Sequence, residues 1–288
     1  MIAQDRTRLT GRLHFFVVAA SLALAGCASA PRWPAPADGL AATAPARGYV
    51  LVDRGTMQLG GGAMARRESF DTWRGPAGER WQRSVVTAAD GSYRVEGEWR
   101  SDARDTRHQV SGRGAIAGEP LAVQFDVQPG RAHLEIRRGT RPVEVLEGVC
   151  TPSCFVDLAP SATATFAMAR AKGLRRGEVR EFRWVGHALQ ADSVLLDGVA
   201  RYVRLEELDV PRPDGSRLRV RHDAFEETVT DLRSGRSGKA FFNLWTDVEG
   251  RPLKFAAART VGLRVGYEDL ASLAPATLEQ AFPPAASR

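Results

Sequence analysis

The feature that most limits the fold of this chain is a hydrophobic pattern of period two that begins after residue 48. Apolar residues alternate with polar or charged ones in segment after segment, as in residues 93–100, 121–128 and 132–137. Successive side chains of a β-strand point to opposite faces of a sheet, so this pattern predicts strands with one buried and one solvated face. Such strands are typical of antiparallel sheets.

Turn signals such as Asp90-Gly91, Pro129-Gly130 and Asp214-Gly215 separate the predicted strands. A flat sheet of so many strands would leave long exposed edges. We therefore expect a mainly β fold, a single curled antiparallel sheet (a β-roll or half-barrel), with short helices only at residues 161–171 and 276–282. Further strands are predicted at residues 56–60, 67–74, 80–88, 107–117, 143–147, 179–186, 199–208, 217–223, 225–233, 240–247 and 252–259.

Residues 1–26 have the pattern of an export signal. A basic stretch precedes an apolar run at residues 15–26, which is shorter than the ~20 residues that a membrane-spanning helix needs. The run ends in Leu24-Ala25-Gly26-Cys27, which resembles the lipobox of bacterial lipoproteins. That resemblance implies that Cys27 becomes a lipid-modified N-terminus. An ordinary signal cut near Ala28 or Ala30 is the alternative.

The remaining chain is expected to divide into three parts. Residues 27–48 hold the lipidated cysteine and an Ala/Pro-rich tether, residues 49–270 the β-roll domain, and residues 271–288 a C-terminal tail. In lipoproteins, an Asp directly after the lipidated cysteine favours retention in the inner membrane, but here the residue is Ala28. The resemblance therefore implies an outer-membrane protein anchored on the periplasmic face.

The charge of the chain gives no indication of a nucleic-acid partner. The formal net charge is +6, and removal of residues 1–26 takes away three Arg and one Asp, which leaves +4. A balance this small over a whole domain is not typical of nucleic-acid binding. The expected partners are the membrane, a lipid or glycolipid ligand and another envelope protein.

Two cysteines remain beyond the anchor, Cys150 and Cys154. In an oxidising compartment such a close pair predicts a disulfide that closes a small loop. A redox or metal role and free thiols are the alternatives.

No local sequence motif indicates catalysis, and neither an enzyme nor a cofactor is expected. The chain lacks a Gly-x-Ser-x-Gly or Ser-x-x-Lys motif, and its histidines have no metal-binding spacing. His133 and His222 fall on alternating strands and are predicted to be solvated. No metal site is predicted.

The cysteine loop and the polar segment after it interrupt the alternation. Asp157, Ser161, Thr163 and Thr165 place one carboxylate and three hydroxyls within nine residues. They can cap a helix, or they can line the mouth of a cavity and bind a polar headgroup.

The same segment carries a family resemblance. Leu146-x-Gly148 and the run from Asp157 to Thr165, with Arg170, Leu174 and Gly177, resemble the central motif of the putative glycolipid-binding family. The stretch from Trp245 to Phe255 resembles a hairpin of that family and is similar to closing strands of periplasmic lipid and lipoprotein carriers. The resemblance implies a spiral antiparallel β-roll and a glycolipid ligand.

We expect non-catalytic binding of an amphiphile in an apolar concave face of the sheet. Two alternatives remain: an envelope interaction module whose aromatic side chains fill the core, and an envelope hydrolase or transferase built around Asp157. The residues predicted on the inward faces are Trp73, Trp81, Trp99, Phe125, Phe182, Trp184, Phe242, Leu244 and Phe255. The candidate ligand contacts are Asp157, Ser161, Thr163, Thr165, Arg170, Trp99, Trp184 and Trp245.

Overall fold

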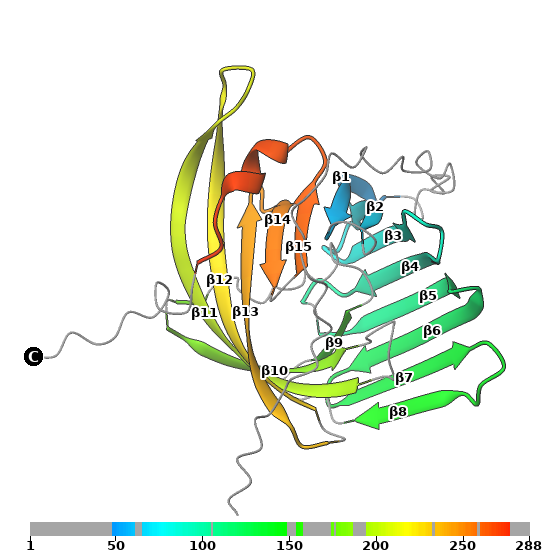
Figure 1. The fold of residues 1–288 in the computed structure, drawn as a ribbon. Coiled ribbons are helices and arrows are strands. Elements are labelled where there is room, and N and C mark those ends of the chain that lie inside the picture. The colour runs from blue at the N-terminus through cyan, green and yellow to red at the C-terminus, as the bar shows by residue number, and fades with distance from the viewer. Residues whose placement is uncertain are drawn as a thin grey trace, which may run out of the picture. The chain divides into compact units, whose positions relative to one another are not determined.

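Fifteen strands and one short helix make up the described part of the chain (Figure 1). This computed structural model describes residues 48–60, 65–104, 106–148, 154–157, 174–175, 177–186, 194–231, 234–257 and 260–276. The strands are β1 (Val50–Leu59), β2 (Arg66–Arg74), β3 (Arg80–Ala88), β4 (Tyr93–Ser101), β5 (His108–Ile116), β6 (Glu119–Gln128), β7 (Arg131–Arg138), β8 (Glu144–Gly148), β9 (Cys154–Asp157), β10 (Val179–Gly186), β11 (Val194–Pro211), β12 (Arg217–Asp231), β13 (Ser237–Thr246), β14 (Pro252–Ala257) and β15 (Thr260–Arg264). The 3-10 helix η2 (Glu268–Ser272) follows them.

All fifteen strands belong to one sheet. Their order is β8-β7-β6-β5-β4-β3-β2-β1-β15-β14-β13-β12-β11-β10-β9, so the first and last strands pair in the middle and the edges are β8 and β9. Every pairing is antiparallel except that of β9 with β10. The prediction of a mainly β fold with a single antiparallel sheet is confirmed, and the sheet is not closed.

Chain connectivity requires this sheet to curl. Fifteen flat strands at ~4.8 Å spacing would place the two edges about 67 Å apart. Only five residues separate the end of β8 from the start of β9, however, and they reach at most about 21 Å. The two edges must therefore come close, and β9 does lie against β6.

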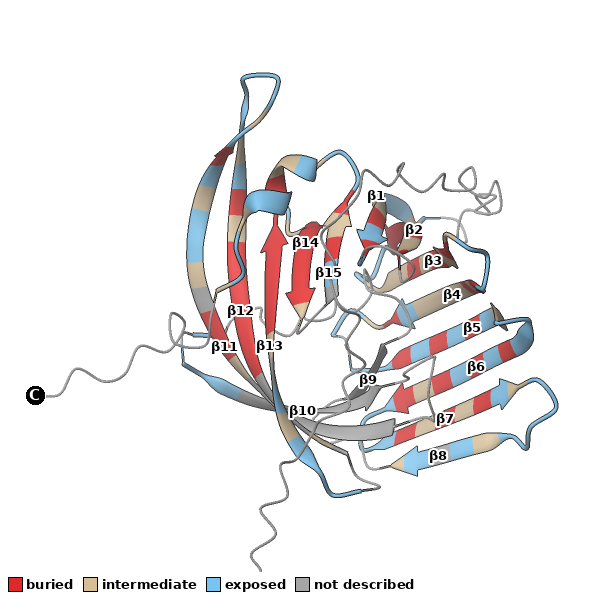
Figure 2. Ribbon diagram, in the orientation of Figure 1, coloured by how far each residue is buried: buried red, intermediate tan, exposed pale blue. Residues whose placement is uncertain are grey.

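The period-two pattern located most strands well and missed strands that are too short to show an alternation. The strands β2 to β7 follow the predicted ranges closely, and on β6 every second residue from Leu121 to Val127 is buried (Figure 2). The predicted strands 217–223 and 225–233 form one continuous strand, β12. The short strands β9 and β15 were not predicted, because four or five residues are too few to show an alternation.

One hydrophobic cluster, called here the interior cluster, joins the two halves of the sheet. It combines side chains of β1 to β7, such as Phe125 and Leu134, with side chains of β11 to β14, such as Tyr202 and Phe225. Residues far apart in strand order meet in it because the sheet curls. Its buried members are Met57, Leu59, Phe70, Val86, Ala88, Tyr93, Val95, Val110, Leu121, Val123, Phe125, Val127, Ala132, Leu134, Ile136, Tyr202, Phe225, Phe242, Leu244 and Phe255.

The predicted inward faces are therefore correct for Phe125, Phe242, Leu244 and Phe255, and Trp99 packs against the cluster. The side chains of Phe182 and Trp184 lie outside the described part.

The inward prediction is wrong for Trp73 and Trp81. Phe70 and Val86 hold the interior positions of β2 and β3, so the alternation places both Trp residues on the opposite face. There the two rings pack together with centroids 5.1 Å apart, and Tyr49 adds an edge contact to Trp81.

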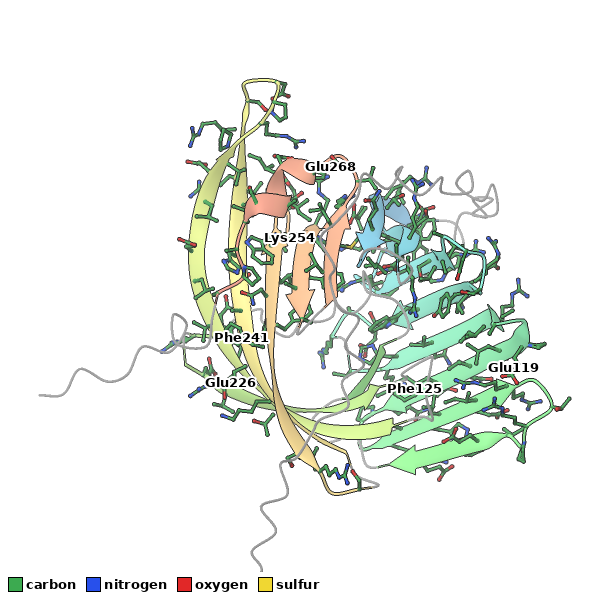
Figure 3. All side chains as sticks on the ribbon, viewed as in Figure 1. Glu119, Phe125, Glu226, Phe241, Lys254 and Glu268 are labelled. Atoms are coloured by element: carbon green, nitrogen blue, oxygen red, sulfur yellow. The ribbon has the colours of Figure 1, made fainter. Side chains whose placement is uncertain are left out.

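A second hydrophobic cluster lies on the other face of β11 to β14, beneath the segment that contains η2. It contains Val220, Trp245, Leu253 and Leu270 among its buried members. The Lys254 ammonium holds η2 in place, because Nζ donates to the carbonyl oxygens of Leu270, Ala271 and Leu273 at 2.9, 3.1 and 2.6 Å (Figure 3). This segment covers a face that the alternation alone presents as solvated.

His222 lies beneath the same segment, so its predicted solvated position is wrong. It is buried, its ring stacks on Trp245 with centroids 4.3 Å apart, and Nε2 donates to Asn243 Oδ1 at 2.9 Å. The same Oδ1 accepts a hydrogen bond from the Ala276 amide at 3.0 Å. Burial lowers the pKa of the His222 imidazole below its ordinary value.

Stability is expected to fall with acidification because of His222. The native state takes up this proton at a lower pH than the unfolded chain does, so the contribution is complete above about pH 6.5 and is lost as the pH falls below that value. The slope from this one group approaches about 1.4 kcal/mol per pH unit. Urea unfolding of His222→Gln between pH 5 and 7 should show a flatter profile than the parent chain. His133→Gln, at a half-exposed imidazole, is the matched control; an equal flattening in both variants would contradict this assignment.

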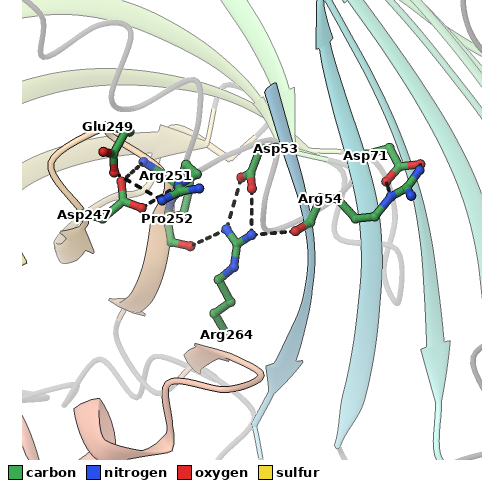
Figure 4. Close-up of polar contacts among 8 residues, drawn as sticks. All are labelled: Asp53, Arg54, Asp71, Asp247, Glu249, Arg251, Pro252 and Arg264. Carbon is green, nitrogen blue, oxygen red and sulfur yellow. Dashed lines mark hydrogen bonds and ion pairs between the residues drawn. The ribbon is translucent and has the colours of Figure 1, made fainter. Parts of the chain in front are cut away.

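The pairing of β1 with β15 is short, and a buried ion pair reinforces it. The two strands pair over three residues each, Met57–Leu59 and Gly262–Arg264. The Arg264 guanidinium donates to both carboxylate oxygens of Asp53, at 2.6 and 3.1 Å, and to the carbonyl oxygens of Arg54 and Pro252 (Figure 4). Gly55 leaves room for this group, since a Cβ there would lie 2.8 Å from Arg264 Cζ.

Candidate functional site

The strongest candidate site is on the interior face of β2 to β6, where polar residues give way to apolar ones from strand to strand. The register places Thr72, Gln82, Trp99, Val110 and Phe125 in one row across five neighbouring strands. We call these residues the interior row. Its first two members are polar and its last two apolar, so one line of side chains offers two chemical environments.

The polar end of the interior row belongs to a larger buried polar region. Thr72 and Gln82 are buried, and so are Glu68 and Ser84 beside them on β2 and β3. Buried polar groups cost free energy unless they are hydrogen-bonded, so such a region must have partners in the protein or in a ligand. This part of the interior face is unlike the continuous apolar concave face expected from the sequence.

Trp99 lies at the boundary between the polar and apolar parts. Its Nε1 donates to Nδ1 of the buried His108 at 3.4 Å, and the two rings meet edge to face. Trp99 is only partly buried, as are three other hydrophobic residues that pack against the interior cluster, namely Ile116, Leu174 and Ala257. These four residues mark places where the apolar interior reaches the surface.

The row of side chains next to the interior row consists of small residues on β3, β4 and β5. Ser84, Gly97 and Gly112 are paired across β3, β4 and β5. A Cβ at Gly97 would reach Ser84 Oγ at 3.4 Å, which is an ordinary contact. From β3 to β5 the interior face therefore carries no large side chain along this row, which continues to Phe70 on β2 and Val123 on β6.

A second buried polar group lies on the opposite half of the interior face. Tyr202 Oη donates to Asp223 at 2.5 Å, and Arg221 donates to Tyr202 Oη at 2.7 Å and pairs with Asp223 at 2.6 Å. Burial, followed by the neighbouring carboxylate, raises the pKa of Tyr202. These groups bind one another, so this cluster stabilises the β11–β12 pair.

The outer face of β3 to β6 is polar and hollowed. A hollow of about 420 Å³ lies between the Arg83–Glu98–Ser111 row and the Val85–Glu96–Arg113 row. A neighbouring hollow of about 340 Å³ shares Glu98 and Ser111 with it and extends to β6. Ion pairs within single strands, such as Arg100–Glu98 at 2.5 Å, neutralise much of this face.

Most residues of the sequence-predicted site lie outside the described residues. These are Cys27, Cys150, Ser161, Thr163, Thr165 and Arg170. Cys154 and Asp157 begin and end β9, and Trp184 belongs to β10, but their side chains are not described. The disulfide and the headgroup contacts thus stay predictions.

The two remaining residues that were predicted to contact a ligand lie in different hydrophobic clusters. Trp99 borders the interior cluster, whereas Trp245 is fully buried in the second cluster beneath η2. Sequence reasoning missed Gln82, Ser84 and His108. The available signal was the alternation itself, which places these polar residues on the buried side of β3 and β5.

Within the described ranges, no three His, Cys, Asp or Glu side chains gather as a metal site would require. In the same part of the chain, no helix has the length and apolar character needed to cross a bilayer.

Comparison with known proteins adds little to this description. No protein-family model matches the chain, so the resemblance to the putative glycolipid-binding family is not confirmed. No curated protein matches it either. Among solved structures, the chain is similar to the crystal structure of a putative lipoprotein from Parabacteroides distasonis ATCC 8503, at 9% identity and a TM-score of 0.34, over 74% of this chain and 94% of that one. This likeness is too weak to carry an argument about function.

Proposed function

We propose that this chain is a lipid-anchored protein of the outer membrane, on its periplasmic face, that binds an amphiphile on the interior face of its sheet without catalysis. One observation carries the proposal: the interior row changes from Thr72 and Gln82 to Val110 and Phe125 across adjacent strands. An amphiphile needs such a pair of environments, a polar one for its headgroup and an apolar one for its chain.

The arrangement suggests how the ligand lies. We propose that its headgroup lies over β2 and β3, where the buried side chains of Thr72, Gln82 and Ser84 are polar. Its chain follows β5 to β7 toward Leu134 and Ile136, which belong to the interior cluster. Trp99, half-buried at the boundary, has an amphipathic ring suited to the junction between headgroup and chain.

Native mass spectrometry of the purified protein tests this proposal. We expect an extractable amphiphile bound one to one, and we expect Gln82→Leu to reduce the ligand-bearing fraction by about tenfold, since leaving a buried polar group without a hydrogen bond costs ~1–3 kcal/mol. Gln109→Leu, on the opposite face of β5, is the matched control and should retain the ligand. Repeated recovery of ligand-free protein from membrane-rich preparations would contradict the proposal.

The hollowed outer face of β3 to β6 favours a second function, binding of an envelope protein. Its charged rim, with Glu98 and Arg113, suits a polar partner. A partner that co-purifies with the parent chain but not with Arg113→Glu, while the amphiphile stays bound, would assign this function to the outer face.

A further inference from the structure

The last described segment, residues 266–276, covers one face of the sheet without being one of its strands (Figure 1). We call it the C-terminal strap. It contains η2 and makes local backbone turns, since the Leu270 amide donates to the Tyr267 carbonyl and the Leu273 amide to the Leu270 carbonyl. It lies over the second hydrophobic cluster, on the face of β11 to β14 opposite the interior face. Side chains of the sheet must therefore hold it in place.

These side chains bind the strap through its backbone. The Arg212 guanidinium donates to the Gly266 carbonyl oxygen at 2.6 Å. The Lys254 ammonium donates to three carbonyl oxygens in η2 and just after it. Asn243 binds both backbone groups of Ala276: its Oδ1 accepts from the amide at 3.0 Å, and its Nδ2 donates to the carbonyl oxygen at 3.5 Å. Because every peptide has these backbone groups, the contacts do not require the sequence of the strap itself.

One leucine anchors the strap in the hydrophobic cluster. Leu270 is fully buried there, whereas residues 271–272 and 274–275 are exposed. The preceding Asp269 carboxylate lies 3.8 Å from Arg212 Nε. When a domain binds a peptide, main-chain hydrogen bonds commonly provide affinity and buried side chains provide specificity. The strap meets the sheet in that way.

The strap leaves a donor beneath it unfilled. Trp245 is fully buried in the same cluster, and its Nε1 has no hydrogen-bond partner among the described residues. A buried donor without an acceptor costs free energy. A peptide that places a carbonyl or carboxylate oxygen at this donor would bind the same face more tightly. The strap is thus an incomplete occupant of the face that it covers.

We infer that this face of β11 to β14 is a peptide-binding site, which the C-terminal strap occupies in cis and a segment of another protein occupies in its place. The partner segment carries a leucine preceded by an acidic residue, as the strap does at Asp269 and Leu270. A second copy of this chain is the other occupant to consider. Its strap would leave the Trp245 donor equally unfilled, so the unfilled donor favours a foreign peptide.

Direct attachment to β15 makes the strap a strong competitor for this site. A segment joined to its own binding site acts at an effective concentration of the order of millimolar. A free peptide at micromolar concentration therefore binds only when the contacts of the strap are weakened or when the peptide makes better contacts. The strap would in this way restrict the site to partners that displace it.

Fluorescence polarisation with a labelled synthetic peptide tests the inference. The probe has the sequence of residues 265–276 with blocked ends. We expect the full chain carrying Leu270→Asp, whose strap no longer fits the cluster, to bind the probe at least about tenfold more tightly than the parent chain does. The same probe carrying Leu270→Asp should bind neither protein.

Arg212 provides a second variant, combined with Leu270→Asp. Arg212→Gln should weaken probe binding about tenfold, because it removes charged contacts to Gly266 and Asp269. Arg217→Gln is the matched control. Arg217 lies on the same hairpin, but its guanidinium donates to the Asp209 carbonyl instead, so probe binding should not change.

Hydrogen exchange of the parent chain decides the result if Leu270→Asp does not fold. On the ¹⁵N-labelled parent chain, NMR should show faster exchange of the Ala276 amide at millimolar concentrations of unlabelled probe, because the probe displaces the strap from Asn243. Unchanged exchange in that case would overturn the inference.

Three other results would also overturn it. They are the absence of probe binding by a folded Leu270→Asp variant, equal weakening by Arg212→Gln and Arg217→Gln, and a dimer in solution that Leu270→Asp dissolves, which would assign the face to a second copy of the chain. Arg212 and Leu270 are not on the interior face, so amphiphile binding can fail or succeed independently.

Discussion

Replacement of Arg264 by Met is expected to lower the free energy of unfolding by about 3–5 kcal/mol, because it leaves the buried Asp53 carboxylate without its partner. The loss is larger than for a surface pair because both side chains are about 90% buried. The same guanidinium also donates hydrogen bonds to the backbone carbonyl oxygens of Arg54 and Pro252. It therefore stabilises the pairing of the first strand, β1, with the last strand, β15, which are paired at only three residues each.

Urea unfolding measures this effect, and Arg113→Met is the control. Arg113 is 84% exposed and pairs with Glu96 at 3.9 Å, so its loss should change the free energy of unfolding by less than about 1 kcal/mol. The double variant Asp53→Asn with Arg264→Met should recover part of the loss, because no buried charge is then left unpaired. Equal destabilisation by Arg113→Met and Arg264→Met would contradict the role assigned to the buried pair.

Replacement of Cys27 by Ser is expected to abolish lipid labelling altogether. The lipobox resemblance assigns the acyl chains to the Cys27 thiol and the new N-terminus that it creates, and a hydroxyl does not support that modification. Cells grown with an alkyne-bearing palmitate should label the parent chain and not Cys27→Ser. Cys150→Ser should keep its label. A labelled Cys27→Ser variant would show that the anchor lies elsewhere.

The sequence predicted the sheet well because the determinant of a half-buried strand is local. In β4, Tyr93 and Val95 are buried while Arg94 and Glu96, which each follow one of them, are partly exposed, and that alternation is visible in the residues themselves. The early part of β1 was missed for the opposite reason. Val50, Leu51 and Val52 show no alternation, because a bulge and an unpaired edge expose all three.

The environment of single side chains was harder to predict, because distant segments decide it. His222 and Trp245 look like ordinary residues of two strands, yet the segment around η2 covers both, and Lys254 fastens that segment through three carbonyl groups. The candidate site shows the same limit. Gln82 and Ser84 have the right spacing for the interior face, but the larger Trp81 between Gln82 and Arg80 suggested the opposite face.

Photo-crosslinking from the interior row tests the central claim most directly. A benzophenone amino acid placed at Trp99 should crosslink to the co-purified amphiphile, because Trp99 lies where the polar and apolar parts of the row meet. The same probe at Gln109, on the outer face of β5, should give no lipid adduct. An adduct at Gln109 and none at Trp99, or no adduct at either position in protein that carries ligand, would contradict binding on the interior face.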